Sequence, residues 1–390
     1  MGEQSRKLSG NGGPAPLSAD DVLDVAIVGA GAAGVGCGII LHALGIKRFA
    51  LLERDDVGAS FTRWPAETRF LTPSFTSNGF GMLDLNAIAL GTSPAYGLQR
   101  EHPSGPEYAD YLQTLAQHFE LPIHKGIEVR GVCPPTRQGN FLLETSHGTL
   151  QSRFVIWAAG EFQYPRLDAF PGADLCLHSS RVRSWSELSG DEFLILGGYE
   201  SGIDAAMHLV AGGKRVRVLD AGSRWTSESS DPSVALSPYT HERLEVARAS
   251  GRLELIGGAR IIHVKRIPRG YAVCSSDERR WKTANVPLLA TGFAGSLRMV
   301  ADLFDRREDG QILLTEHDES SRTPGLFVVG PEVKHDKIIF CFIYKFRQRF
   351  AVVAHAIGKR LGIDLAPLKV YRERGMFLDD LSCCGEQCTC

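Results

Sequence analysis

Short apolar runs that end at a glycine recur along the chain. The first occupies residues 25–28 (VAIV), and a glycine-rich turn and an Ala- and Ile-rich segment then lead to Gly45. A second apolar run over 49–52 ends at Glu53. This order predicts a strand, a turn, a helix and a second strand, which together make one α/β unit of a parallel sheet.

The same order returns 168 residues later, counted from Gly29 to Gly197. The stretch FLILGGYESGIDAAMHLVAGGKRVRVLD again predicts strand, glycine-rich turn, helix and strand, and it ends at Asp220. The runs RFVIWAAG, VPLLATGF and GLFVVGP end in glycine-containing turns as well. Apolar residues at helical spacing over 339–357 predict a long helix, whose aromatic residues we expect in the core.

The composition fits a globular protein. The chain has 390 residues, 43% of them hydrophobic and 23% charged, which allows two or three domains with full-sized cores. A net charge of −2 gives no electrostatic footprint for nucleic acid. No apolar run reaches membrane-spanning length, and residues 1–20 lack the apolar core of a signal peptide and predict a disordered segment. We therefore expect a cytoplasmic protein with neither a nucleic-acid nor a membrane partner.

The first glycine-rich turn has the spacing of a dinucleotide site. Gly29 permits the tight turn, Gly31 lets a pyrophosphate approach the backbone, and Gly34 allows the helix to pack closely on the strand. Unpaired N–H groups at the start of the helix bind phosphate, and Glu53 can accept a hydrogen bond from a ribose hydroxyl. Three glycines alone are a weak signal, but the strand, turn, helix, strand and acid together are specific.

The second glycine-rich turn departs from this spacing. Gly197 and Gly202 hold the outer positions, but Tyr199 replaces the middle glycine. A second dinucleotide site is still favoured over a vestigial unit. Asp220 suits the free 2′-hydroxyl of NADH, whereas Arg224 suits the 2′-phosphate of NADPH, so the sequence leaves the choice between NADH and NADPH open.

The ordered set GAGAAG, LLER, WAAG, GGYESG, LLATGF and GLFVVGP resembles the flavoprotein superfamily with two dinucleotide-binding domains. The resemblance covers nearly all of residues 22–362, and it implies FAD together with NADPH or NADH as cofactors. It also implies an α/β fold of two Rossmann-like three-layer ββα domains. The expected parts are a disordered segment 1–20, an FAD domain over 21–165 and 286–365, an inserted NAD(P)H domain over 166–285, and a flexible Cys-rich tail over 366–390.

The resemblance assigns candidate cofactor residues to these motifs. Those expected around FAD are Gly29, Gly31, Ala32, Ala33, Gly34, Glu53, Arg54, Ser60, Trp64, Val129 (through its backbone), Ala159, Gly160, Thr291, Gly292, Gly330 and Pro331. Those expected around the nicotinamide dinucleotide are Gly197, Gly198, Ser201, Gly202, Asp220 and Arg224. Pro331 stands where relatives carry an aspartate that contacts the flavin ribityl chain. Glu332 or a backbone N–H must therefore replace that contact.

Two branches of the superfamily are similar to this chain. GASFTRWPAETRFLTPSFTSNGFGMLDLNAI is similar to the stretch that follows the FAD acid in bacillithiol-disulfide reductase-like flavoproteins, although that branch carries a cysteine where this chain has Ala33. Flavin-containing monooxygenases share a Gly and Trp arrangement like that of Gly58 and Trp64. Their linker motif, Phe-x-Gly followed by His, is only loosely echoed by FPGADLCLHS.

Four of the nine cysteines lie in the last eight residues. The other five, Cys37, Cys133, Cys176, Cys274 and Cys341, stand singly in apolar surroundings and predict reduced core residues. The domains contain no C-x-x-C or C-x4-C pair, so the candidate catalytic relay is Cys383, Cys384, Cys388 and Cys390. The same four thiols are candidate ligands of a soft metal ion, and LSCCG resembles the C-terminal end of mercuric reductases. The other interpretation is a Cys-rich end without a catalytic part.

Together these features predict an FAD-dependent NAD(P)H oxidoreductase. Electrons would pass from the nicotinamide through the flavin to a small-molecule disulfide or a thiol-bound metal, with the tail cysteines as relay. The alternatives are a flavin monooxygenase and a non-enzymatic, dinucleotide-bound sensor or metal carrier. Relatives are commonly dimers, so a homodimer is also considered.

Overall fold

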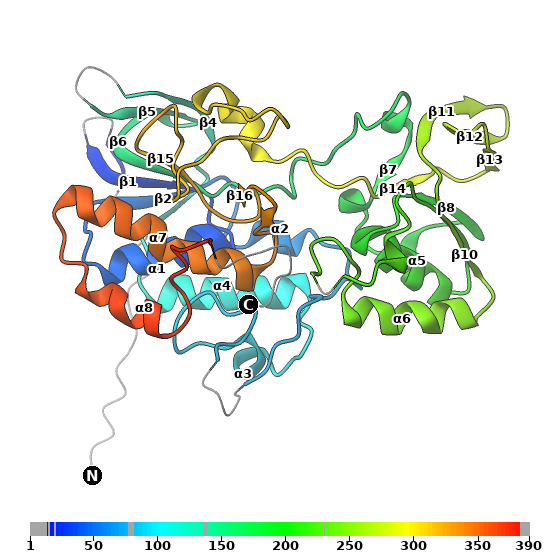
Figure 1. The fold of residues 1–390 in the computed structure, drawn as a ribbon, viewed down its shortest axis with the longest axis horizontal. Coiled ribbons are helices and arrows are strands. Elements are labelled where there is room, and N and C mark those ends of the chain that lie inside the picture. Colours follow the sequence, from blue (N-terminus) through cyan, green and yellow to red (C-terminus); the bar gives the residue numbers. More distant parts are fainter. Residues whose placement is uncertain are drawn as a thin grey trace, which may run out of the picture.

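Two α/β lobes lie side by side in the structure, which is a computed structural model (Figure 1). It describes residues 14, 16–18, 21–76, 82–135, 139–229 and 231–382. The predicted disorder of residues 1–20 therefore falls almost wholly outside the described residues. Within the described part of the chain, no helix is long and apolar enough to cross a membrane.

The first lobe is built on a seven-stranded sheet. Its strands are β1 (Val22–Val28), β2 (Phe49–Glu53), β3 (Ile123–Lys125), β4 (Val129–Cys133), β5 (Phe141–Thr145), β6 (Gly148–Trp157) and β15 (Leu326–Val328). The order β3-β2-β1-β6 is parallel, and β5 and β4 continue from β6 as an antiparallel meander. β15 pairs in parallel with the last residues of β6, so a segment from near the end of the chain completes the first sheet.

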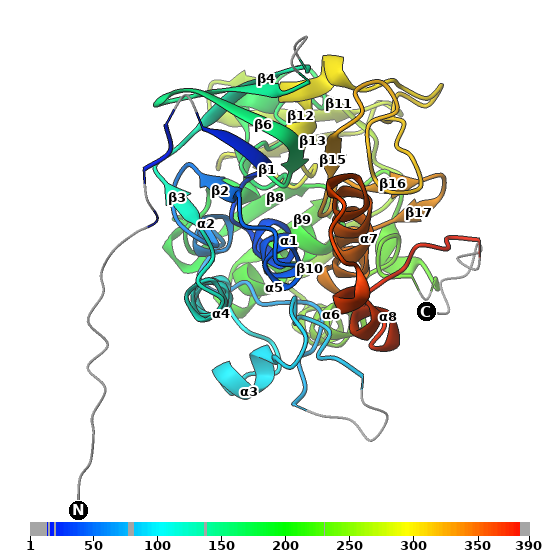
Figure 2. The ribbon, with the colours of Figure 1, turned by 90° about the vertical axis from the view of Figure 1, so that its left-hand side faces the viewer.

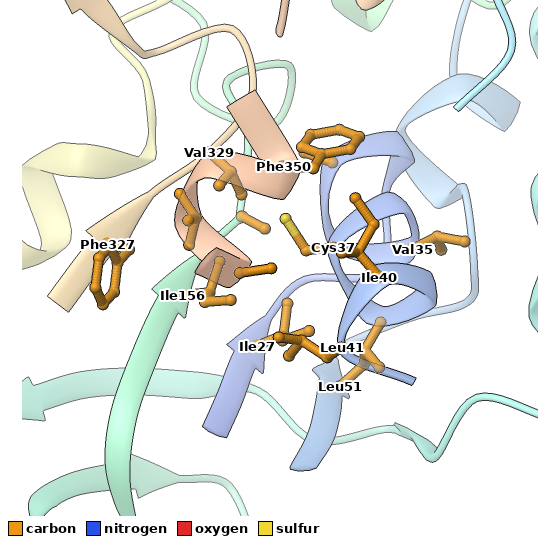
Figure 3. Packing of buried hydrophobic residues seen from close by; sticks show 14 of the residues in the cluster. Ile27, Val35, Cys37, Ile40, Leu41, Leu51, Ile156, Phe327, Val329 and Phe350 are labelled. Atoms are coloured by element: carbon orange, nitrogen blue, oxygen red, sulfur yellow. The ribbon is translucent and has the colours of Figure 1, made fainter. Parts of the chain in front are cut away.

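Helices cover this sheet. They are α1 (Ala32–Ala43), α2 (Ala59–Thr62), α3 (Pro94–Leu98), α4 (Gly105–His118), α7 (Ile343–Leu361) and α8 (Lys369–Glu373), together with the 3-10 helices η5 (Ser296–Leu303) and η6 (Ala366–Leu368). α1 and α7 pack closely because Gly36 has no side chain: a Cβ there would lie 2.2 Å from the ring of Phe350. Cys37 is buried beside this contact, among Ile40 and Phe350 (Figure 3).

The second lobe contains a five-stranded parallel sheet in the order β10-β9-β8-β14-β7. These strands are β7 (Leu177–His178), β8 (Glu192–Leu196), β9 (Arg215–Leu219), β10 (Leu253–Ile256) and β14 (Leu288–Leu289). Helices α5 (Glu200–Ala211) and α6 (Pro238–Ala249) share one core cluster with this sheet. The antiparallel sheet of β11 (Ile261–Ile267), β12 (Gly270–Ser275) and β13 (Arg280–Thr283) shares the other.

Each lobe combines a largely parallel sheet with helices and with additional antiparallel strands. This confirms the predicted α/β class with Rossmann-like ββα domains. Two expectations for the C-terminal part were wrong. The helix expected from residue 339 begins at Ile343, because Ile338–Ile339 (β17) pairs with Lys334–His335 (β16) as a two-stranded hairpin.

Residues 366–382 were also expected to belong to a flexible tail, but they pack on the first lobe. η6 and α8 lie there, and Tyr371 and Met376 are buried, the latter completely. The backbone N–H of Leu378 donates to Gln348 O at 3.0 Å, and the Arg349 guanidinium donates to Leu378 O. Figure 2 shows this red segment running beside α7. The segment is held here because four of its apolar side chains are buried in the core of the first lobe, namely Leu368, Tyr371, Met376 and Phe377.

Candidate functional site

The first glycine-rich turn has the geometry that its spacing predicts. Gly29 has a φ of +102° and follows directly on β1. A Cβ at Gly34 would lie 2.0 Å from Gly29 O, so only glycine allows α1 to pack this closely on the turn. At Gly31 a Cβ would meet no atom within 4 Å. The space beside Gly31 is therefore open to a ligand rather than filled by the protein.

The start of α1 fits a pyrophosphate. Gly31 is its N-cap and provides no capping side chain, and the first turn holds no acidic residue. Its N–H groups and the helix dipole are thus available to an anion. Glu53 accepts hydrogen bonds from the backbone N–H groups of Ala30 (2.7 Å) and Asp55 (2.8 Å). A carboxylate has about four lone-pair positions, so Glu53 retains capacity for ribose hydroxyls. These residues fit FAD.

A cavity of about 420 Å³ opens from this turn. It lies at the carboxyl ends of β1, β2 and β6, where open α/β sheets bind their ligands. Of the residues predicted around FAD, the following line it: Gly29, Gly31, Ala32, Ala33, Glu53, Arg54, Ser60, Trp64, Val129, Ala159, Gly160 and Pro331. The spacing of the motifs thus brings most of the predicted FAD residues into one place.

Four predicted residues lie beside the cavity rather than in its wall. Gly34 acts through the close packing of α1, and Gly330 directly precedes the wall residue Pro331. Thr291 Oγ1 donates to Arg166 O at 3.0 Å, and Gly292 O accepts from the backbone N–H of Arg166 at 3.0 Å. Thr291 and Gly292 therefore join the segment around residue 292 to the segment around residue 166, and these are the two segments by which the chain passes between the lobes.

Aromatic side chains form one wall of the cavity. The ring centroids of Phe61 and Trp64 are 5.3 Å apart, and those of Phe61 and Phe70 are 5.7 Å apart. Phe342 and Phe346, at the start of α7, contribute from another side. These two residues were expected to be core residues, and that interpretation was incomplete. Phe342 is half-buried and lines the cavity, whereas Phe346 is buried in the core and lines the cavity as well.

The second glycine-rich turn also has the Rossmann form. Gly197 has a φ of +110°, and a Cβ at Gly202 would lie 1.9 Å from Gly197 O, which repeats the relation of Gly34 to Gly29. Tyr199 is the N-cap of α5, and its hydroxyl donates to Pro232 O. Its side chain thus leaves the turn toward residue 232, which explains how the turn accommodates a tyrosine at the middle position.

Asp220 and Arg224 have different surroundings. The Asp220 carboxylate accepts from the backbone N–H groups of Gly198 (2.8 Å), Gly222 (2.8 Å) and Ser223 (2.6 Å). Most of its hydrogen-bonding capacity is therefore used within the turn. Arg224 is exposed, and its guanidinium carbon lies 4.6 Å from the ring centroid of Tyr199. Arg224 is therefore better placed than Asp220 to contact a bound ligand.

The cavity extends to the second lobe. Ser201, in the first turn of α5, lines it together with Ser179, Ser180 and Trp185. The other residues predicted around the nicotinamide dinucleotide, Gly197, Gly198, Gly202, Asp220 and Arg224, lie outside its wall. One continuous cavity therefore joins the first glycine-rich turn to the start of the helix that follows the second.

Polar contacts fix the lobes around this cavity. The Glu67 carboxylate accepts from Ser184 Oγ (2.5 Å) and from the backbone N–H groups of Trp185 (3.1 Å) and Ser186 (3.2 Å). Thr68 Oγ1 donates to Asp204 Oδ2 at 2.8 Å. Burial opposes ionisation of Glu67, but these hydrogen bonds outweigh it and hold the pKa of Glu67 below its usual value.

The sequence did not single out Glu161, which follows Gly160 in the cavity wall. Burial raises the pKa of Glu161 to about 7, and the negative charge of Glu332 adds to the rise. Glu332 itself accepts from Ser296 Oγ (2.5 Å) and from the Leu297 N–H (3.2 Å). It therefore caps η5 rather than replacing, in the cavity wall, the aspartate that relatives carry at Pro331.

Cys341 was expected to be a core residue, but it is half-buried and lines the cavity. Cys133 is half-buried as well, whereas Cys37, Cys176 and Cys274 are buried as expected. The predicted relay and metal residues Cys383, Cys384, Cys388 and Cys390 lie outside the described residues. Among the residues that the structure describes, no group of three or more His, Cys, Asp or Glu side chains is placed to hold a metal ion.

Comparison with known proteins agrees with this geometry. Residues 26–330 match the family model described as pyridine nucleotide-disulphide oxidoreductase. Bacilliredoxin reductase from Bacillus subtilis is 23% identical over 344 residues, which cover 86% of this chain and 97% of that protein.

Two solved structures have a similar fold. Bacillithiol disulfide reductase from Staphylococcus aureus has a TM-score of 0.68 at 18% identity, covering 87% of this chain and 99% of the other. A flavin-containing monooxygenase from Stenotrophomonas maltophilia has a TM-score of 0.65 at 17% identity, with the same coverage. The family model matches well over half of the sequence. The chain therefore belongs to the pyridine nucleotide-disulphide oxidoreductase family and is a flavin-dependent oxidoreductase that uses FAD and NAD(P)H.

Proposed function

We propose that the chain is an NADPH-dependent reductase of a small-molecule disulfide, with FAD between the two. The observation that carries this proposal is the single cavity that runs from Gly31 at the start of α1 to Ser201 at the start of α5. A flavin on the first lobe and a nicotinamide on the second would meet inside it. The protein supplies the binding, the orientation and the exclusion of water, and the cofactors supply the electron transfer.

NADPH is favoured over NADH by the surroundings of the second turn. Asp220 already accepts three backbone hydrogen bonds, which leaves little capacity for the two ribose hydroxyls of NADH. Arg224 is exposed beside the same turn, and a guanidinium pairs well with a 2′-phosphate. Stacking on Tyr199 fixes the direction from which Arg224 approaches.

The disulfide substrate is proposed from the likeness to bacillithiol disulfide reductase, which extends over 99% of that chain. We also propose the tail cysteines, Cys383, Cys384, Cys388 and Cys390, as an onward relay for electrons or as ligands of a thiophilic metal ion. The five described cysteines are all free, so a fixed redox disulfide is absent from the described part of the chain.

Anaerobic oxidation of NADPH and NADH by the flavin-loaded protein tests this function. Small disulfides and thiophilic metal ions serve as acceptors, and full-length protein is compared with a version ending at Ser382. We expect disulfide-dependent turnover with a lower KM for NADPH than for NADH. Loss of turnover in the shorter protein, with flavin reduction still fast, would establish the relay. Equal turnover in both would restrict the chemistry to the described cavity.

Oxygenation of a small molecule is the second candidate function, and the aromatic wall of Phe61, Trp64 and Phe70 is the observation in its favour. An apolar wall excludes water, which protects reactive flavin states from side reactions. Reoxidation by oxygen alone, with a product that gains one oxygen atom, would establish it in place of the reductase.

A further inference from the structure

A thiol that the proposed function has not used lies in the cavity wall at the junction of the lobes. Cys341 stands two residues before α7, and its Sγ donates to Ser233 Oγ of the second lobe at 3.2 Å. Lys345 Nζ donates to the same hydroxyl at 2.8 Å and to Asp231 Oδ1 at 2.7 Å. Lys345 and Ser233 are both buried. The Ser233 hydroxyl, which also accepts from Lys345, therefore holds the Cys341 thiol in one position.

Glu161 brings a carboxylate into the same cavity. It enters from the carboxyl end of β6, and it forms no hydrogen bond or ion pair through its side chain with any residue that the structure describes. The charged and titratable groups that act on it are Glu332 and Lys334. Glu161 and Cys341 both line this cavity, and the negative charge of Glu161 is one of the causes that raise the pKa of the Cys341 thiol.

An unpaired donor marks the same cavity as the place of a ligand. Trp185 is only 3% exposed, and within the described residues its Nε1–H has no hydrogen-bond partner. Trp185 also lines the cavity that contains Cys341 and Glu161. Buried polar groups are normally paired, so this indole is expected to donate to an atom that arrives with a ligand.

We propose that Cys341 is the thiol that attacks a low-molecular-weight disulfide in this cavity and that Glu161 is the base that takes its proton. The proposal deepens the reductase function and rests on it. Burial raises the pKa of the Cys341 thiol, and the charge of Glu161 raises it further against the opposing effects of Ser233 and Lys345. The thiol is thus protonated near neutral pH and needs a base for attack. Burial places the pKa of Glu161 at about 7, which suits that base.

The exchange step balances without an external oxidant or reductant, because Cys341 is oxidised to a mixed disulfide while one substrate sulfur is reduced to a thiol. The Cys341 proton moves to the Glu161 carboxylate, a bond forms between Sγ and one substrate sulfur, and the substrate S–S bond breaks. The leaving thiolate then takes the proton from Glu161. The products are a mixed disulfide on Cys341 and one free thiol. Release of the second thiol consumes two electrons and two protons, which NADPH and one further proton supply.

The test follows the mixed disulfide directly, without NADPH. The flavin-loaded protein, full-length and ending at Ser382, is incubated with 2-hydroxyethyl disulfide, and the adduct is located by peptide mass spectrometry. We expect the adduct on Cys341 in both forms, and none at this site in Cys341→Ser. The rate should rise with pH through about 7 as Glu161 ionises and should fall at least about tenfold at pH 8 in Glu161→Gln, with that inflection lost.

Cys133→Ser is the matched control, because Cys133 is half-buried and lies 3.9 Å from the Glu144 carboxylate but outside the cavity. It should leave the Cys341 adduct unchanged. An adduct confined to Cys133 or to the tail overturns the proposal even if Cys341→Ser fails to fold, because it is mapped in the wild-type chain. An unchanged pH profile in Glu161→Gln overturns the role of Glu161.

The test also separates this inference from the proposed function. NADPH-driven turnover of the disulfide that persists in Cys341→Ser leaves the reductase standing and removes the role of Cys341. An adduct on Cys341 without any disulfide turnover under NADPH leaves the reactive thiol standing and removes the reductase.

Discussion

Gly31 and Gly34 stand three residues apart, but a side chain would have a different effect at each position. A Cβ at Gly34 would lie 2.0 Å from Gly29 O, whereas one at Gly31 would meet no protein atom within 4 Å. The first constraint concerns packing of α1 on the turn. The second concerns only what approaches from the cavity.

This difference gives a paired prediction. Gly31→Ala should leave the apoprotein's free energy of unfolding within about 0.5 kcal/mol, because the methyl group contacts nothing. It should lower flavin affinity at least about tenfold, or about 1.4 kcal/mol, because the methyl group meets the pyrophosphate. Gly34→Ala should destabilise the apoprotein by about 1–3 kcal/mol through overpacking. Chemical denaturation of the apoprotein and flavin titration measure both. Equal destabilisation by the two variants would contradict this account of Gly31.

The residues that the sequence predicted share one property: they belong to local patterns. The spacing of the glycines and the acid after β2 identified Gly29, Gly31 and Glu53, and the cavity contains all three. Glu161 and Cys341 lie far apart in sequence and in no motif, and only the pairing of β6 with β15 and the return of α7 bring them together. The sequence offered one signal for Glu161, since an acidic residue directly follows the glycine of WAAG at the end of a predicted strand.

At the scale of elements, residues 366–382 show why sequence patterns did not predict that this segment packs on the first lobe. η6 and α8 are too short to show a helical repeat, and the contacts of Tyr371 and Met376 are made with distant parts of the first lobe. A flexible tail from residue 366 would have given the terminal cysteines a long reach. Because Leu378 is hydrogen-bonded to α7, such a reach cannot begin at residue 366.

The packed segment predicts that two changes near the C-terminus will differ in effect. Met376→Ala should lower the free energy of unfolding by about 2–5 kcal/mol, because it leaves a cavity where a fully buried side chain stood. Truncation after Ser382 should leave the midpoint of denaturation unchanged, since it removes none of the buried described residues. Denaturant unfolding of both proteins is the measurement. A large loss of stability on truncation would show that residues beyond Ser382 contribute to the fold.

For the whole molecule, function depends on how the lobes are held around one cavity. The two glycine-rich turns lie on different sheets, so a nicotinamide bound to the second lobe meets the flavin only if the lobes keep their relative position. Glu67 and Thr68 of the first lobe hydrogen-bond to residues of the second. Lys345 of the first lobe likewise donates to Asp231 and Ser233 of the second. Sequence patterns predicted both turns but none of these contacts, because each contact joins residues that lie more than 100 positions apart and share no motif.

Loosening this connection should therefore slow hydride transfer without weakening flavin binding. Thr68→Val removes the 2.8 Å hydrogen bond to Asp204 while keeping the side-chain shape, and it leaves a buried carboxylate with one partner fewer. We expect flavin reduction by NADPH to slow by about tenfold, because small misplacements of reacting groups lower rates strongly. Anaerobic stopped-flow absorbance measures that rate, and flavin titration measures the binding. Thr62→Val is the matched control, since its hydroxyl donates only to Ala59 O within α2. Equal flavin reduction rates in Thr68→Val and Thr62→Val would mean that the other contacts hold the lobes in position without Thr68. Slower reduction in Thr68→Val alone would show that its hydrogen bond to Asp204 keeps the two lobes aligned around the cavity.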